Sequence, residues 1–246
     1  MNDIFSILKK SGALITNDHF VYTSGKHGSE YVNKDAVYTN PDWLDELCRL
    51  LAVQFAGWDI DVVVAPAVGG VNLTTSVTRS LRSLTGKDIR AIYSEHDELS
   101  LMKAEDAATI DCRYSDGQGI YARPLAMGDE LLIRPRQFVI KRGYDKLLAG
   151  GKRVLVVEDV LTTGGSARET VRAARKVGGE VAAVAALCNR GNVMAEYLEV
   201  PELFALVDVQ MKMYDEAECP LCAAGVPINT QVGKGKAFLA RKSQSA

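Results

Sequence analysis

Two carboxylates and a run of hydroxyl and glycine residues stand together in the chain, and these residue types are well suited to chemistry. Glu158 and Asp159 follow a valine-rich run, and the segment 162–166 (Thr-Thr-Gly-Gly-Ser) comes soon after them. The run 153–157 is typical of a buried strand, and the residues from 166 to 177 are typical of a helix. Ligands of α/β sheets bind where such strands end. We therefore expect the functional site here.

The segment 162–166 suits a phosphate monoester. Successive backbone N–H groups at the start of a helix form a concave anion site, and the threonine and serine hydroxyls add donors. The two carboxylates need a different partner, and vicinal sugar hydroxyls about 5 Å from the phosphate would fit them. The pattern predicts a ligand of the size of ribose 5-phosphate. A solvated acidic loop with a tight turn would explain the two acids alone, but poorly explains the whole ordered string.

The elements around this segment alternate β-branched runs with helical patterns, which is typical of a parallel sheet with crossover helices. The predicted strands are residues 61–66, 90–93, 153–157, 181–187 and 204–208, and the predicted helices are 42–55, 71–84 and 166–177. The expected fold class is therefore α/β, with a central parallel sheet flanked by helices.

Two segments do not follow this alternation of strands and helices. Residues 1–40 predict a small lobe, with a helix over 3–10 and strands over 19–23 and 31–33, which we expect to pack as a flap over one end of the sheet. The stretch 94–137 is too long for an ordinary connection. It contains alternating apolar residues and an Asp-Gly turn, so it predicts an inserted β-hairpin.

Composition excludes several function classes. The chain has 246 residues with 29 basic and 31 acidic side chains, a net charge of −2, so it lacks the basic excess of an electrostatic nucleic-acid binder. It has no run of 18 apolar residues and no signal-peptide pattern at its start, so neither a membrane span nor secretion is expected. The odd number of scattered cysteines suits a reducing compartment. We expect a cytoplasmic protein.

Several segments carry a resemblance to one enzyme family. The string 154–166 resembles the 13-residue phosphoribosyl pyrophosphate (PRPP) signature of type I phosphoribosyltransferases. Residues 19–33 are similar to the N-terminal segment of orotate phosphoribosyltransferases, 65–70 to the pyrophosphate loop of the family, and 219–227 to the ending of one bacterial branch. The resemblance covers nearly the whole chain except 97–137.

The resemblance implies an activity and a layout. The activity is Mg²⁺-dependent transfer of ribose 5-phosphate from PRPP to orotate, giving orotidine 5′-phosphate and pyrophosphate. The resemblance implies that Mg²⁺ binds mainly through PRPP, and it assigns no protein residue to a metal. A homodimer is also implied. The layout is one domain over 1–246, composed of an N-terminal hood (1–40), a core sheet (41–96 and 138–210), an insertion (97–137) and a C-terminal extension (211–246).

The resemblance also implies residue roles. Asp159 and Glu158 are the expected catalytic residues. The expected PRPP-binding residues are Glu158, Asp159, Thr162, Thr163, Gly164, Gly165, Ser166, Gly69, Gly70 and Lys26, and the expected orotate-binding residues are Tyr31, Val32, Thr162 and Arg190.

The chain departs from the best-known branch of the family where that branch has catalytic cations. Thr23 and Gly69 stand at positions of two lysines, and the segment 94–97 replaces a basic mobile loop. We hypothesise that the insertion is a lid with relocated cations. The possible substitutes are Lys26, His27, His96, Lys103, Arg113 and Arg123. Transfer to another base, or a PRPP-sensing regulator that has lost catalysis, are the alternative functions.

Cys219 and Cys222 form a Cys-x-x-Cys pair, which is half of a zinc site. The chain has only His19, His27 and His96 to complete such a site. We favour structural thiols, while metal binding and a redox role stay open.

Overall fold

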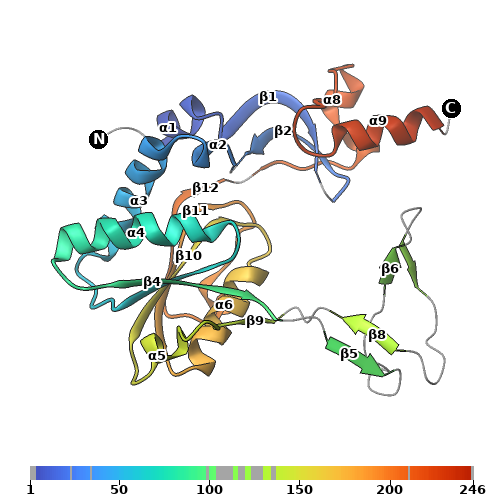
Figure 1. Ribbon diagram of the computed structural model, residues 1–246. Coiled ribbons are helices and arrows are strands. Elements are labelled where there is room, and N and C mark those ends of the chain that lie inside the picture. The colour runs from blue at the N-terminus through green and yellow to red at the C-terminus, as the bar shows by residue number, and fades with distance from the viewer. Residues whose placement is uncertain are drawn as a thin grey trace.

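The structure is a computed structural model that describes residues 4–22, 24–33, 35–97, 100–103, 113–115, 120–122, 130–133, 137–209 and 211–244. Its centre is a six-stranded sheet in the order β12-β11-β10-β3-β4-β9 (Figure 1). Neighbouring strands are parallel except for β9, which runs antiparallel to β4. The strands are β3 (Val62–Pro66), β4 (Arg90–His96), β9 (Phe138–Val139), β10 (Arg153–Leu161), β11 (Glu180–Asn189) and β12 (Leu203–Asp208).

Helices cover both faces of the sheet because its central strands are apolar on both sides. In β3, Val63 and Ala65 face the core that contains side chains of α3 (Pro41–Phe55) and α4 (Gly70–Thr85). The alternate residues of β3 face the opposite core, which contains α6 (Gly165–Lys176). The shorter helices α5 (Asp145–Leu148) and α7 (Ala195–Leu198) contribute to this second core. This arrangement confirms the expected α/β class with a flanked, mostly parallel sheet.

The hood precedes the sheet and packs against its α3 side. It consists of α1 (Ile4–Lys10), the antiparallel pair β1 (Leu14–Val21) and β2 (His27–Val32), and α2 (Asp35–Tyr38). Both strands begin earlier than the sequence predicted. The alternation over the first half of β1 is weak, and pairing with β2 extends the strand there, beginning with Leu14 opposite Val32.

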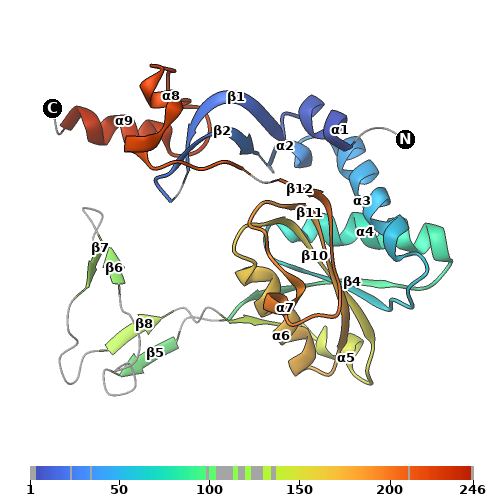
Figure 2. The same ribbon diagram turned by 180° about the vertical axis from the view of Figure 1, so that it is seen from behind.

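The C-terminal segment lies beside the hood in both views (Figures 1 and 2). It contains the 3₁₀ turn η1 (Glu216–Glu218) and the helices α8 (Pro220–Ala223) and α9 (Gly235–Gln244). Reciprocal backbone hydrogen bonds join His27 and Tyr214, with N···O distances of 2.8 and 2.9 Å. The N–H of Asn229 also donates to the carbonyl of His19, at 2.7 Å. The hood and the C-terminal segment therefore pack together as one unit.

The insertion contains two short antiparallel pairs that lie apart from the sheet in both views (Figures 1 and 2). The strand β5 (Ser100–Lys103) pairs with β8 (Glu130–Ile133), and β6 (Arg113–Ser115) pairs with β7 (Ile120–Ala122). The expected β-hairpin excursion is confirmed. The Asp-Gly turn within it lies outside the described residues, and the lid hypothesis stays a prediction.

None of the helices described has the length and apolar character that crossing a membrane requires.

Candidate active site

The two acids lie on β10, a strand buried between β3 and β11. Glu158 and Asp159 are only 8% and 3% exposed. The strand continues to Leu161, four residues beyond the predicted end at 157, because β11 pairs with it along this whole stretch. The acids are therefore held by a rigid ladder instead of starting a loop.

Hydrogen bonds fix both carboxylates. The backbone N–H of Asp159 donates to Glu158 Oε1 at 3.1 Å, and that of Val160 donates to Asp159 Oδ1 at 2.6 Å. The hydroxyl of Tyr38 donates to Asp159 Oδ2 at 3.3 Å. Burial, followed by the charge of Asp159, raises the pKa of Tyr38 well above its usual range, so the hydroxyl keeps the proton that it donates.

Tyr38 is a site residue that the sequence did not indicate. It lies 121 residues before Asp159 and is contributed by α2 of the hood. No local spacing indicates such a contact. Tyr38 therefore couples the hood to the acid pair.

The segment 162–166 forms an open turn at the start of α6. Thr162, Thr163 and Ser166 are exposed, so their hydroxyls are available to a ligand. Gly164 has a φ of +74° immediately before the helix, a conformation that favours glycine. A β-carbon there would also lie 2.8 Å from the side chain of Val193. The turn thus presents hydroxyls and the N-terminal N–H groups of a helix, as an anion site requires.

Arg190 follows β11 and contacts this turn. Its Nε donates to the hydroxyl of Thr162 at 3.1 Å, and its backbone N–H donates to Leu161 at 3.0 Å. Gly191 is required here, because a β-carbon would lie 1.6 Å from the carbonyl oxygen of Thr162. A cavity of about 740 Å³ that includes Arg190 and Asp208 opens beside this contact. The structure therefore brings a guanidinium to the edge of the phosphate turn.

The expected pyrophosphate loop follows β3, which pairs directly with β10. Parallel neighbours end at the same sheet edge, so this loop and the phosphate turn share that edge. Val68 and Gly69 are exposed, whereas Gly70 is buried at the start of α4. A β-carbon at Gly70 would lie 2.5 Å from that of Ala65, so the close approach of helix and strand requires glycine.

The hood places the other predicted ligand residues. Tyr31 packs against Phe20 with ring centroids 5.3 Å apart, and Val32 pairs with the first residue of β1. Lys26 Nζ lies 3.0 Å from Asp215 Oδ2 in the C-terminal segment. Their roles in orotate and PRPP binding stay predictions.

The substitute cations have different outcomes. His27 is fully buried beside His19 and Cys222, so it cannot reach a solvated pyrophosphate and that hypothesis is wrong. His96 is exposed, with its ring 4.2 Å from that of Phe138. Of the positions discussed above, Thr23 and Arg123 lie outside the described residues, and Lys103 and Arg113 lie on strands whose side chains are not described.

Residues 33–200 match the family model described as the phosphoribosyl transferase domain. The matched range includes the acid pair and the phosphate turn. The orotate phosphoribosyltransferase of Caldanaerobacter subterraneus subsp. tengcongensis is 31% identical over 87% of this chain and 88% of that protein. The enzyme of that name from Pelotomaculum thermopropionicum is 32% identical over 92% of this chain and 94% of its own length.

A solved structure supports the fold. It is the orotate phosphoribosyltransferase of Mycobacterium tuberculosis H37Rv in complex with PRPP, which is 20% identical and matches with a TM-score of 0.52 over 83% of this chain and 95% of that chain. The family model and the sequence relatives lead to one conclusion. The chain belongs to the phosphoribosyltransferase family, among the orotate phosphoribosyltransferases.

Proposed function

We propose that this protein transfers ribose 5-phosphate from PRPP to orotate, giving orotidine 5′-phosphate and pyrophosphate. The observation that carries the proposal is the rigid acid pair on β10, which leads into a phosphate turn contacted by Arg190. The relatives named above support orotate as the acceptor.

In the reaction, the bond between C1 of the ribose and the pyrophosphate oxygen breaks. A bond from C1 to a ring nitrogen of orotate forms, and that nitrogen gives up its proton. Positive charge develops on the ribose, as in glycoside hydrolysis, and negative charge on the leaving pyrophosphate. No covalent nucleophile is needed, so positioning and charge stabilisation are what the protein must supply.

Each part of the site has a role in this scheme. Glu158 and Asp159 hold the ribose hydroxyls and face the developing cation. The turn 162–166 binds the 5-phosphate through N–H groups and hydroxyls. Arg190 pairs with the carboxylate of orotate, and a bidentate, charge-assisted contact of this kind also orients the ring. Because Gly69 and Gly70 have no side chains, the backbone of their loop can approach the pyrophosphate closely.

The donor set fits Mg²⁺ bound largely through substrate. Mg²⁺ prefers oxygen ligands and usually keeps several waters while contacting one or two carboxylates and phosphate oxygens. Glu158 and Asp159 offer such carboxylates beside the phosphate turn. When bound, the ion would neutralise charge on the pyrophosphate. A homodimer and a cytoplasmic location belong to the same proposal, and the free thiols of Cys48 and Cys188 suit a reducing compartment.

Loss of orotate absorbance on adding Mg²⁺ and PRPP tests the proposal, with uracil, hypoxanthine and adenine as replacement acceptors in parallel reactions. We expect orotate to be consumed and the other bases to remain. Consumption of another base instead of orotate would make this a phosphoribosyltransferase of different specificity. PRPP binding without consumption of any base would favour a non-catalytic sensor.

A further inference from the structure

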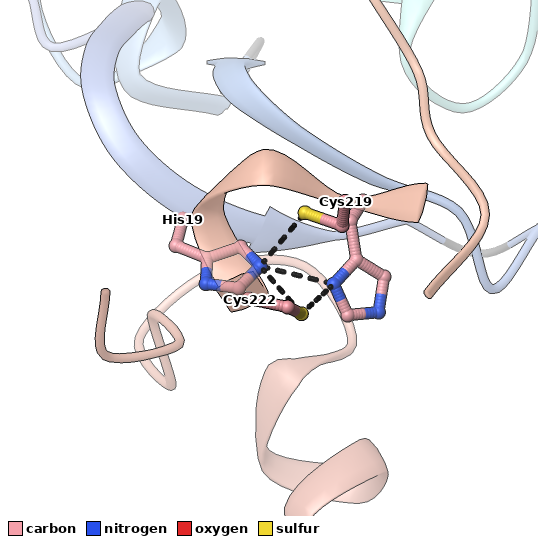
Figure 3. A group of neighbouring side chains, drawn as sticks. His19, Cys219 and Cys222 are labelled. Carbon is pink, nitrogen blue, oxygen red and sulfur yellow. Dashed lines mark hydrogen bonds between the residues drawn. The ribbon is translucent and has the colours of Figure 1, made fainter. Parts of the chain in front are cut away.

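Two histidines of the hood and two cysteines of the C-terminal segment form a cluster that the proposed reaction does not use. His19 lies on β1, His27 begins β2, Cys219 precedes α8, and Cys222 lies on α8. The side chains of His19, Cys219 and Cys222 point toward one another (Figure 3). One nitrogen or sulfur atom from each of the four residues lies within 4.8 Å of the others.

The separations within this His/Cys cluster are those of ligands around a single ion. His19 Nε2 lies 3.7 Å from the Sγ of Cys219 and also from that of Cys222. His27 Nδ1 lies 3.3 Å from the Sγ of Cys222 and 2.9 Å from His19 Nε2. Tetrahedral zinc with its usual bond lengths sets such ligand atoms about 3.3–3.8 Å apart. At 2.9 Å, the two histidine nitrogens need to separate by a few tenths of an ångström to reach this range.

The surroundings favour metal coordination by the histidines. His19 Nδ1 lies 2.8 Å from the carbonyl oxygen of Val226 and can donate to it. That contact selects the tautomer with a lone pair on Nε2, the atom aimed at the cluster, and it is the outer contact that metal-bound histidines usually make. The ring of His27 packs edge-on against Phe238, with centroids 4.9 Å apart, which holds its orientation.

We propose that His19, His27, Cys219 and Cys222 bind one Zn²⁺ in a tetrahedral site that fastens the C-terminal segment to the hood. The two thiols release their protons as the metal binds, so two thiolates balance the charge of the ion. A neutral assembly of this kind suits a cluster in which three of the four residues are buried.

Zinc accounts for the cluster better than the alternatives. The cysteines are free thiols, and each sulfur lies within 3.7 Å of a histidine nitrogen, a contact that a disulfide would not require. Magnesium and calcium prefer oxygen ligands, whereas two thiolates and two imidazoles are a common structural zinc set.

The ion has a route to the site. Cys222 is partly exposed, and a cavity of about 470 Å³ beside it is bordered by Glu216, Cys219 and Lys242. The proposed ligands come from segments about 200 residues apart in the chain, since Cys219 and His19 are separated by that distance in sequence. Binding would therefore stabilise the junction that also contains the Lys26–Asp215 ion pair.

Elemental analysis of the untagged full-length protein tests this site directly. We expect one equivalent of zinc per chain, either after purification or after incubation of the reduced protein with Zn²⁺. Replacement by Co²⁺ should give the visible absorption of a tetrahedral, thiolate-bound ion. Removing zinc with a chelator should lower the melting temperature, and adding it back should restore it.

Variants locate the ion. Cys222→Ser should lower zinc affinity at least about tenfold, because loss of a ligand costs no less than loss of an outer contact to a ligand. His96→Ala and Cys48→Ala, which change an exposed histidine and a core thiol outside the cluster, should keep the full equivalent. The proposal is overturned if the reduced wild-type protein binds no zinc, if it selects another metal, or if Cys222→Ser binds zinc as tightly as the controls. A Cys219–Cys222 disulfide in protein isolated from cells would also overturn it.

Discussion

Asp159 is the residue on which the proposed chemistry depends most. Its two oxygens are oriented by Val160 and Tyr38, and little of the side chain is exposed. An amide of the same shape cannot stabilise a developing positive charge as a carboxylate does. We therefore expect Asp159→Asn to lower kcat at least ~100-fold. Steady-state kinetics and circular dichroism together would show whether activity falls while the fold is kept.

The control for this change is Asp42→Asn, an exposed carboxyl in the first turn of α3. It should keep wild-type kinetics. Near wild-type activity of Asp159→Asn would remove the acid pair from the mechanism.

Arg190 offers a second test at the residue scale, because its contact with Thr162 places it between the phosphate turn and the adjoining cavity. Loss of a charge-assisted bidentate contact costs roughly 1.5–3 kcal/mol, which corresponds to about 10- to 150-fold in binding. Arg190→Ala should therefore raise KM for orotate by this factor and change KM for PRPP much less. Arg190→Lys keeps the charge but not the planar fork, so its KM for orotate should lie between those of the wild type and Arg190→Ala. Equal effects on both substrates would make Arg190 a structural residue.

The connection after β11 positions this arginine, and glycine is what allows it to pass close to the phosphate turn. Because a β-carbon at Gly191 would overlap the carbonyl of Thr162, Gly191→Ala must displace one of the two segments. We expect kcat/KM to fall at least ~10-fold, since small misplacements of binding groups are costly in catalysis. Gly57→Ala is the matched control, because a β-carbon there meets no atom within 4 Å. Unchanged kinetics for Gly191→Ala would show that this close approach is not needed.

The helix α6 begins at the phosphate turn and is fastened by Glu199, which follows α7. Glu199 Oε1 accepts hydrogen bonds from Arg168 at 2.7 Å and from Arg172 at 2.6 Å. These contacts, first with Arg172 and then with Arg168, lower the pKa of Glu199 to about 2 from its ordinary 4.5. A depressed pKa in the folded state means that this carboxylate stabilises the protein above the unfolded-state pKa and loses that effect as pH falls through the folded-state pKa.

Glu199→Gln should accordingly lower the melting temperature near neutral pH, by about 1–3 °C for an exposed pair. The difference from wild type should shrink as the pH falls from about 4.5 toward about 2. Thermal unfolding of both proteins across this range measures it. A difference that stays constant with pH would mean that the carboxylate charge is not what fastens the helix.

Across the whole molecule, the core was predictable because its signals are local. Apolar runs such as 153–157 predict strands, and the ordered string of residues that ends at Ser166 predicts the phosphate turn. The end of β10 was not predictable, because pairing with β11 extends that strand through two acids, a residue type that is depleted in strands.

Long-range contacts could not be predicted from the sequence either. Nothing near Tyr38 indicates that its hydroxyl meets Asp159, and the Cys-x-x-Cys pair left open whether His27 lies beside Cys222. Both contacts arise when the hood folds onto distant segments. The departure from the family pattern made His27 a candidate substitute for a missing cation, whereas the packing of the C-terminal segment removes it from solvent.

The account as a whole depends on one chemical event, transfer of the ribose from pyrophosphate to orotate. Phosphorus NMR of a reaction containing protein, Mg²⁺, PRPP and orotate follows every phosphorylated species at once. We predict that orotidine 5′-phosphate and pyrophosphate appear in equal amounts as PRPP disappears, and that omission of orotate stops the reaction. Persistence of PRPP in the complete mixture, or its conversion to ribose 5-phosphate without the nucleotide, would contradict the account.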